Sequence, residues 1–149
     1  MTAKASYFKS KKAVNENKRI SMIAWNVAGL CNKDSKFWKE INKHDIIGLT
    51  ETWMERTSKK VEECWSKDHK WTMIKAEREA KKGRAKGGIL IGIRKEWKVE
   101  VEAKSKDMVE IRGVINNKKW NIFILYLREG RKEQMNILEK AIDAKWERE

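Results

Sequence analysis

Asn26 and Glu51 are the residues of this chain whose types and spacing best suit chemistry. Each stands at the end of a run of apolar residues, Asn26 within 20–27 and Glu51 just after 46–49. A carboxylate oxygen and a carboxamide oxygen are ligands that hard cations such as Mg²⁺ or Mn²⁺ accept. The pair therefore predicts half of a metal site, provided that the fold brings the two residues together.

The elements around these residues favour that convergence. The alternating stretch 20–27 is apolar on both faces, which is typical of a strand covered on two sides. A polar capping residue opens an amphipathic stretch that predicts a helix over 34–43, and 46–49 is a second short apolar run. A strand, a crossover helix and a second strand give a parallel pair whose carboxyl ends share one sheet edge. We therefore expect Asn26 and Glu51 to lie at the same edge.

Each residue also has a purely structural interpretation. Glu51 can be a solvent-exposed acid at the end of a strand, and Asn26 can be a turn-forming residue before Gly29. Both interpretations stay open at the level of sequence.

Two motifs resemble the start of a known family. The stretches WNVAGL (25–30) and DIIGLTETW (45–53) resemble the opening of the endonuclease/exonuclease/phosphatase family. The resemblance is greatest to the endonuclease domain of non-LTR retrotransposons and to the apurinic-site DNA repair nucleases. It implies a Mg²⁺-dependent, phosphodiester-cleaving DNA endonuclease in which Asn26 and Glu51 belong to the metal site.

Tyr126 is a third candidate catalytic residue on the basis of this resemblance. In the apurinic-site branch, a tyrosine at the end of the matching strand reaches the scissile phosphate. Family members usually carry a proline close behind it, whereas Leu127 and Arg128 follow here. The alternative is an amphipathic tyrosine at the rim of a core strand.

The later motifs of the family do not occur in this sequence. A GDFN-like motif is absent, and neither His44 nor His69 stands in an SDH-like context. The resemblance thus covers about the first half of the domain, without the His–Asp general base, a step worth about 10²–10⁴ in rate. We therefore expect a truncated domain, inactive alone.

The predicted fold class is α/β. We expect one mixed β-sheet of about six strands with flanking helices over residues 20–149, about half of the family's two-sheet, four-layer sandwich. The remaining expected elements are a helix at 58–66, strands at 71–76, 89–94, 98–103, 108–115 and 120–127, a turn at 116–119, and a helix at 130–147 with Met135, Leu138, Ile142 and Trp146 on one stripe.

Half of a sandwich leaves one sheet face without cover. We expect this face to carry Ile89, Ile91, Ile93 and Phe123 or their alternates, and to be a surface for a second half-domain or for self-association.

The charge of the chain favours nucleic acid as the partner. The formal net charge is +13, and residues 1–19 read as a basic flexible leader. The loop before Gly87 and Gly88 is the most basic internal run, and we expect it to contact the phosphate backbone of DNA without sequence preference through Lys81, Lys82, Arg84 and Lys86. An ordinary solvated basic loop is the alternative.

Other function classes are disfavoured. No apolar run is long enough to span a membrane, and the start has no secretory signal, so we expect no membrane association and an intracellular location in nucleus or cytoplasm. Cys31 and Cys64 form no metal-binding pattern. Besides the nuclease reading, we keep two others: a non-catalytic basic module that binds nucleic acid or another half-domain, and a product without selected function.

Overall fold

The protein is described by a computed structural model that covers residues 19–127, 130 and 132–146, without the side chains of residues 145 and 146. The predicted leader, apart from Arg19, and the side chain of Trp146 therefore lie outside the described residues. In chain order the elements are β1 (Met22–Asn26), α1 (Ser35–Ile41), β2 (Ile46–Thr50), α2 (Lys59–Glu62), β3 (His69–Ile74), β4 (Ile89–Arg94), β5 (Lys98–Ser105), β6 (Met108–Ile115), β7 (Lys118–Leu125) and α3 (Lys132–Trp146).

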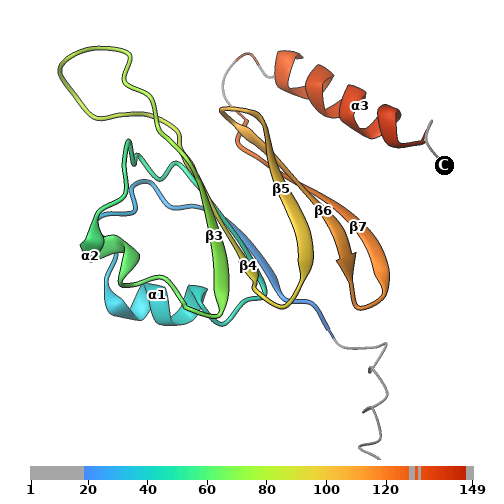
Figure 1. Cartoon of the computed structure of the whole chain (residues 1–149). Helices are drawn as coiled ribbons and strands as arrows, with labels where there is room; N and C mark the ends of the chain where they lie inside the picture. The colour runs from blue at the N-terminus through green and yellow to red at the C-terminus, as the bar shows by residue number, and fades with distance from the viewer. Residues whose placement is uncertain (1–18, 128–129, 131, 147–149) are drawn as a thin grey trace, which may run out of the picture.

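The strands form two sheets (Figure 1). Strands β1–β2–β4–β3 make a mixed sheet in which β1 and β2 are parallel, and β5–β6–β7 make an antiparallel meander. The mixed α/β class and the parallel β1–β2 pair are confirmed. The single sheet of about six strands is wrong, because the chain leaves the first sheet after Arg94 and starts a second one at Lys98.

Helices α1 and α2 cover one face of the four-stranded sheet (Figure 1). Asp34 caps α1 by accepting the backbone N–H of Phe37 at 2.8 Å, and α1 buries Trp38 and Ile41. These residues pack with Val27, Leu30, Ile47, Leu49, Met54, Val61 and Leu90. Helix α2 is a single turn, much shorter than the predicted helix at 58–66.

The opposite face of this sheet packs against the three-stranded sheet. Strand alternation places Ile89, Ile91 and Ile93 on this face, and all three are buried. Their partners in the second sheet are Val109, Ile111, Ile115 and Ile124. The prediction of an uncovered isoleucine face is therefore wrong. From β7 the alternate set to Phe123 packs in this core, with Ile124 buried and Ile122 partly buried.

A glycine allows the two sheets to approach closely. A Cβ at Gly48 of β2 would lie 2.5 Å from Cδ1 of Ile124 in β7. A side chain at this position would require Ile124 to move.

The two outer strands β1 and β7 are less buried than their sequences suggest. Strand β1 is an edge strand on which Met22 and Trp25 are 53% and 49% exposed, so the prediction that it is covered on both sides is wrong. The run at 120–127 is also not fully buried, because β7 is an edge strand and only Ile124 reaches low exposure. The Asn116–Asn117 turn before β7 is confirmed, with both residues in the left-handed region.

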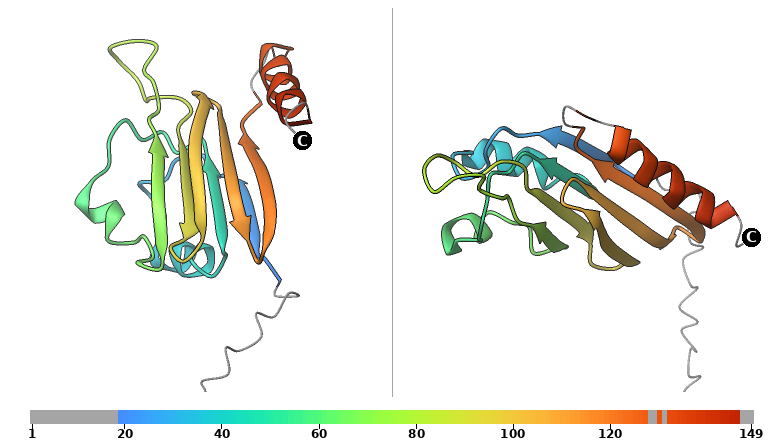
Figure 2. Two further views of the ribbon diagram at one scale, coloured as in Figure 1. Left: turned by 45° about the vertical axis from the view of Figure 1, so that its right-hand side comes forward. Right: turned by 90° about the horizontal axis from the view of Figure 1, so that it is seen from above.

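Helix α3 lies beside the second sheet and away from α1 and α2 (Figure 2). Gln134 ties its first turn to the sheet, donating to Asp107 Oδ2 at 3.0 Å and to the Tyr126 carbonyl oxygen at 3.1 Å. Its predicted stripe is only partly covered, with Leu138 half-buried and Met135 and Ile142 exposed. Among the helices that the structure describes, none is long and apolar enough to cross a membrane.

Candidate functional site

Strand pairing brings Asn26 and Glu51 to one edge of the four-stranded sheet. Asn26 is the register partner of Thr50 across the parallel pair, and Glu51 is the next residue. The predicted convergence at the carboxyl ends of β1 and β2 is therefore confirmed. The loop between β3 and β4 and the end of β7 lie at this same end of the molecule (Figure 1).

The backbone at this edge is strained. Glu51 and Trp53 have φ angles of +55° and +58°, in the left-handed region that costs an L-residue about 1–2 kcal/mol. Backbone hydrogen bonds hold this conformation: Gly29 donates to the Glu51 carbonyl at 2.8 Å, and Trp53 donates to Gly87 at 2.9 Å. Strain that the surrounding structure maintains is frequent at functional sites.

The Glu51 carboxylate is positioned by Trp53. The indole Nε1–H donates to Oε2 of Glu51 at 2.6 Å, a short charge-assisted hydrogen bond. The half-buried carboxylate is thereby oriented, and among the described residues its other oxygen accepts no hydrogen bond. That oxygen is available to a cation.

Two further residues hold the Trp53 ring. The Arg84 guanidinium lies over the ring, with Cζ 3.8 Å from the ring centroid, which is a cation–π contact. Gly29 passes close to the ring, since a Cβ there would meet Cε3 of Trp53 at 2.7 Å. The sequence indicated no role for Trp53 beyond its place at the end of the DIIGLTETW motif, two residues after the strand-end acid.

Asn26 has a structural role at this edge. Its Oδ1 accepts the backbone N–H of Ala28 at 3.1 Å, and Ala28 itself has a φ of +46°. The turn-forming interpretation of Asn26 is thus confirmed. The carboxamide oxygen keeps a second lone pair, so a role as a cation ligand remains a prediction.

The donor set suits a weakly held cation. Glu51 offers a free carboxylate oxygen and Asn26 an amide oxygen, and Mg²⁺ commonly binds through one or two carboxylates while keeping several waters. Within the described residues, no three His, Cys, Asp or Glu side chains group closely enough to hold a metal. Any ion here would retain most of its water shell.

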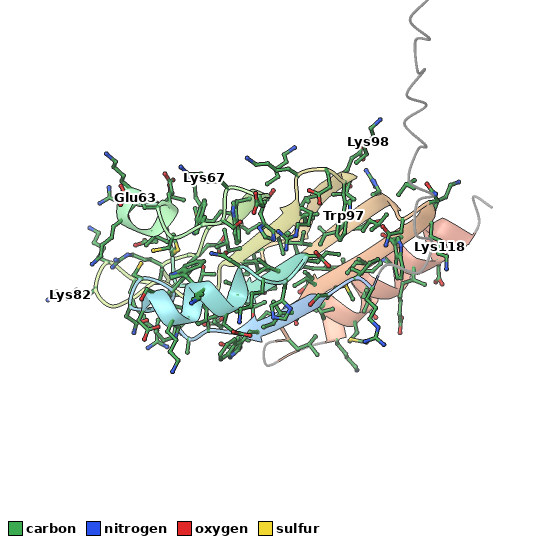
Figure 3. All side chains as sticks on the ribbon, turned by 90° about the horizontal axis from the view of Figure 1, so that it is seen from below. Glu63, Lys67, Lys82, Trp97, Lys98 and Lys118 are labelled. Atoms are coloured by element: carbon green, nitrogen blue, oxygen red, sulfur yellow. The ribbon has the colours of Figure 1, made fainter. Side chains whose placement is uncertain are left out.

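The four predicted phosphate contacts differ in their surroundings. Lys86 pairs with Glu79 at 2.9 Å, and Arg84 is stacked on Trp53. Lys81 and Lys82 are exposed and have no ion pair among the described residues. The loop projects from the end of the sheet, and Lys82 points outward from it (Figures 1 and 3).

An ion pair fixes the base of this loop. The Nε of Arg78 donates to Glu55 Oε1 at 2.7 Å, and this hydrogen bond lowers the pKa of the Glu55 carboxyl and raises the pKa of Arg78. A backbone bridge between Glu77 and Lys86 closes the loop.

Tyr126 lies at the same end of the molecule, where β7 ends. Its backbone N–H donates to the Asp107 carbonyl at 2.9 Å, and its carbonyl accepts from Gln134. These bonds anchor it to the β5–β6 turn and to α3. Its predicted role at a scissile phosphate stays a prediction.

The histidines belong to the opposite end of the sheet. His69 is buried, and its Nε2–H donates to the His44 carbonyl oxygen at 2.7 Å, while Nδ1 has no partner among the described residues. Burial lowers the pKa of His69. His69 thus has a structural role, and its burial favours the neutral form of the ring.

No protein-family model matches this chain, and no curated protein is significantly similar to it. The resemblance of the two motifs to the endonuclease/exonuclease/phosphatase family therefore stays a prediction, and the function has to be inferred from the site itself.

Proposed function

We propose that the edge formed by Asn26, Glu51 and the loop at 75–88 binds the phosphate backbone of DNA through a divalent cation. In this proposal the chain is the metal-binding part of a phosphodiester-cleaving endonuclease of the endonuclease/exonuclease/phosphatase type. The observation that supports it is the Glu51 carboxylate, oriented by Trp53 at 2.6 Å and placed beside Asn26 at the carboxyl ends of two parallel strands.

Glu51 and Asn26 would hold Mg²⁺ or Mn²⁺ and leave most of its coordination sphere to water and phosphate. Such an ion neutralises charge on a phosphodiester and polarises its phosphorus–oxygen bonds. Trp53 keeps the carboxylate in place, and the loop supplies Lys81 and Lys82 as cations for neighbouring phosphates. No His–Asp pair in this sequence can serve as the general base, so we expect no cleavage by this chain alone.

Metal binding tests the proposal directly. Titration of the protein with Mn²⁺, followed by electron paramagnetic resonance, is expected to show one weak site that Glu51→Gln removes. Glu63→Gln is a matched control, because Glu63 is an exposed acid at the end of α2 and belongs neither to β1 nor to the loop after β2. Equal Mn²⁺ binding by the wild type and both variants would refute the metal site.

Nicking of supercoiled plasmid with Mg²⁺ tests the catalytic part. We expect no nicking above background for wild type and for Glu51→Gln. Mg²⁺-dependent nicking that is lost in Glu51→Gln would instead show that this chain carries a complete catalytic apparatus.

A non-catalytic nucleic-acid-binding module is the second candidate. It is favoured by the net charge of +13 and by the unpaired lysines of the loop. This candidate predicts that neither EDTA nor Glu51→Gln changes the affinity for DNA. The metal-dependent proposal predicts that both lower it.

Association with a second half-domain or with another copy remains a prediction. The isoleucine face is not its surface, because the second sheet covers it. Exposed apolar side chains available to such a partner include Met22 and Trp25 of β1 and Met135 and Ile142 of α3.

A further inference from the structure

A groove of about 670 Å³ runs between the two sheets on the side where β3 and β5 form their edges. Among the described residues, β3 pairs only with β4 and β5 pairs only with β6. Seen from above, β3, β4 and β5 occupy one side of the molecule, and β1, β7 and α3 the other (Figure 2).

The floor of the groove is apolar and firmly held. Ile93 of β4 is buried there, and Val99 and Val101 of β5 pack against the core between the sheets. Trp97 lies at one end of the groove, half-buried against the same core. A fixed aromatic side chain with part of its surface exposed is suited to stacking against a flat ligand.

The acids of the groove are paired with neighbouring cations. Glu100 pairs with Arg112 at 3.1 Å, and Glu102 pairs with Arg112 and with Lys104, each at 3.2 Å. The buried Glu110 shares these two cations, at 2.9 Å from Lys104 and 3.9 Å from Arg112. A further cation of the lining, Arg94, is bound to Asp45 at 3.0 Å.

Three lysines of the groove keep their charge uncompensated. Lys70, Lys95 and Lys98 are exposed, and within the part of the chain that the structure describes they form no ion pair. Lys98 points into solvent beside Trp97 (Figure 3). The groove therefore offers three free positive charges around an aromatic ring and an apolar floor.

We propose that this groove binds single-stranded nucleic acid, with phosphates on Lys70, Lys95 and Lys98 and a base against Trp97. Free cations along a path, combined with an aromatic platform, are the features by which proteins hold single strands without sequence preference. The volume lies within the range of pockets that hold small ligands, which suits a single base better than a whole double helix.

This site is separate from the metal-binding edge. Strand β4 begins beside Gly87 and Gly88, which bond to the Glu51 loop, and ends at Arg94 in the groove. The six-residue strand places the two ends about 17 Å apart. The inference does not depend on Glu51 or on a cation, so its failure and that of the proposed function can be distinguished.

The test compares two triple variants with the same change of charge. The groove variant replaces Lys70, Lys95 and Lys98 by Ala, and the control replaces Lys36, Lys39 and Lys59, which are exposed lysines of α1 and α2. Binding of a fluorescent oligothymidylate is measured by anisotropy over a range of salt concentrations in EDTA, and circular dichroism verifies folding.

We expect the groove variant to lower the slope of log affinity against log salt by about 2, since each single-strand phosphate contributes about 0.7. The control is expected to leave the slope unchanged. Trp97→Leu keeps an apolar side chain on the core, and it is expected to weaken binding about tenfold without changing the slope, because base stacking is lost.

Four outcomes would overturn the proposal. The first three are an unchanged slope in the groove variant, an equal loss of slope in both triple variants, and equal loss of affinity for a duplex of the same length. A fourth is a groove variant that loses binding of an oligoglutamate peptide but not of oligothymidylate, which would assign the groove to an acidic protein segment.

Discussion

Replacing Gly29 by Ala tests whether Trp53 is as closely packed as the structure shows. Gly29 has a φ of +96°, and a Cβ there would lie 2.7 Å and 2.9 Å from two ring carbons of Trp53. The left-handed backbone costs an alanine about 1–2 kcal/mol. Displacing a packed ring adds about 1–3 kcal/mol. We therefore expect Gly29→Ala to lower the free energy of unfolding by about 2–5 kcal/mol.

Gly83→Ala is the matched control for this substitution. Gly83 has nearly the same φ, +99°, but a Cβ there would meet no atom within 4 Å. It carries only the backbone cost, about 1–2 kcal/mol, or less where an exposed loop relaxes. The difference between the two variants measures the steric contact with Trp53.

Urea unfolding followed by circular dichroism gives both free energies by linear extrapolation. A double-mutant cycle with Trp53→Ala isolates the contact, because removing the ring should restore about 1–3 kcal/mol to the Gly29→Ala variant. A difference between Gly29→Ala and Gly83→Ala below about 0.5 kcal/mol would refute the reasoning.

Two more predictions concern charge. Burial lowers the pKa of His69 below its ordinary value of 6.5, so the unfolded chain binds more protons near that pH than the folded protein does. The free energy of unfolding should therefore fall as the pH drops from 7 to 5. In thermal melts, His69→Asn should flatten this pH dependence. If about six phosphates are contacted, duplex DNA affinity should fall about 10³-fold between 50 and 200 mM salt. Neutralising four of the basic residues of the loop should reduce this slope in anisotropy titrations; these four are Lys81, Lys82, Arg84 and Lys86. Binding that is insensitive to salt would contradict a backbone-reading surface.

Much of the first half of the fold follows from residue patterns. The two apolar runs ending near Asn26 and Glu51, with a capped amphipathic helix between them, permit little besides a parallel pair, and that is what forms. The strand at 89–94 and the two-asparagine turn were likewise predictable from local composition.

The division of the strands into two sheets could not be predicted from residue patterns. Strand β5 alternates Val99 and Val101 with charged residues, and this pattern is the same whether the strand pairs with β4 or begins another sheet. The link over 95–97 has the length of a hairpin loop, yet it crosses from one sheet to the other. The second sheet covers the isoleucine face only because the chain crosses at this point. The crossing cannot be predicted from the sequence, so the face was predicted to be uncovered.

The role of Trp53 was out of reach for a different reason. Its hydrogen bond to Glu51 requires a left-handed backbone at both residues, and neither Glu nor Trp indicates such a conformation. Long-range backbone hydrogen bonds hold it, among them those from Gly29 to Glu51 and from Trp53 to Gly87.

The single crossing between the sheets has a consequence for the way the protein is made. The four-stranded sheet is complete at Arg94, whereas its cover, the meander, ends at Leu125. At typical rates of translation, about 2–6 seconds separate the emergence of Arg94 from the ribosome and that of Leu125. During that interval Ile89, Ile91 and Ile93 are an open β-surface on a nascent chain, the kind of surface that aggregates or recruits chaperones. The growing polypeptide is therefore most vulnerable after the part that carries Asn26 and Glu51 has been made and before the ribosome has supplied β7.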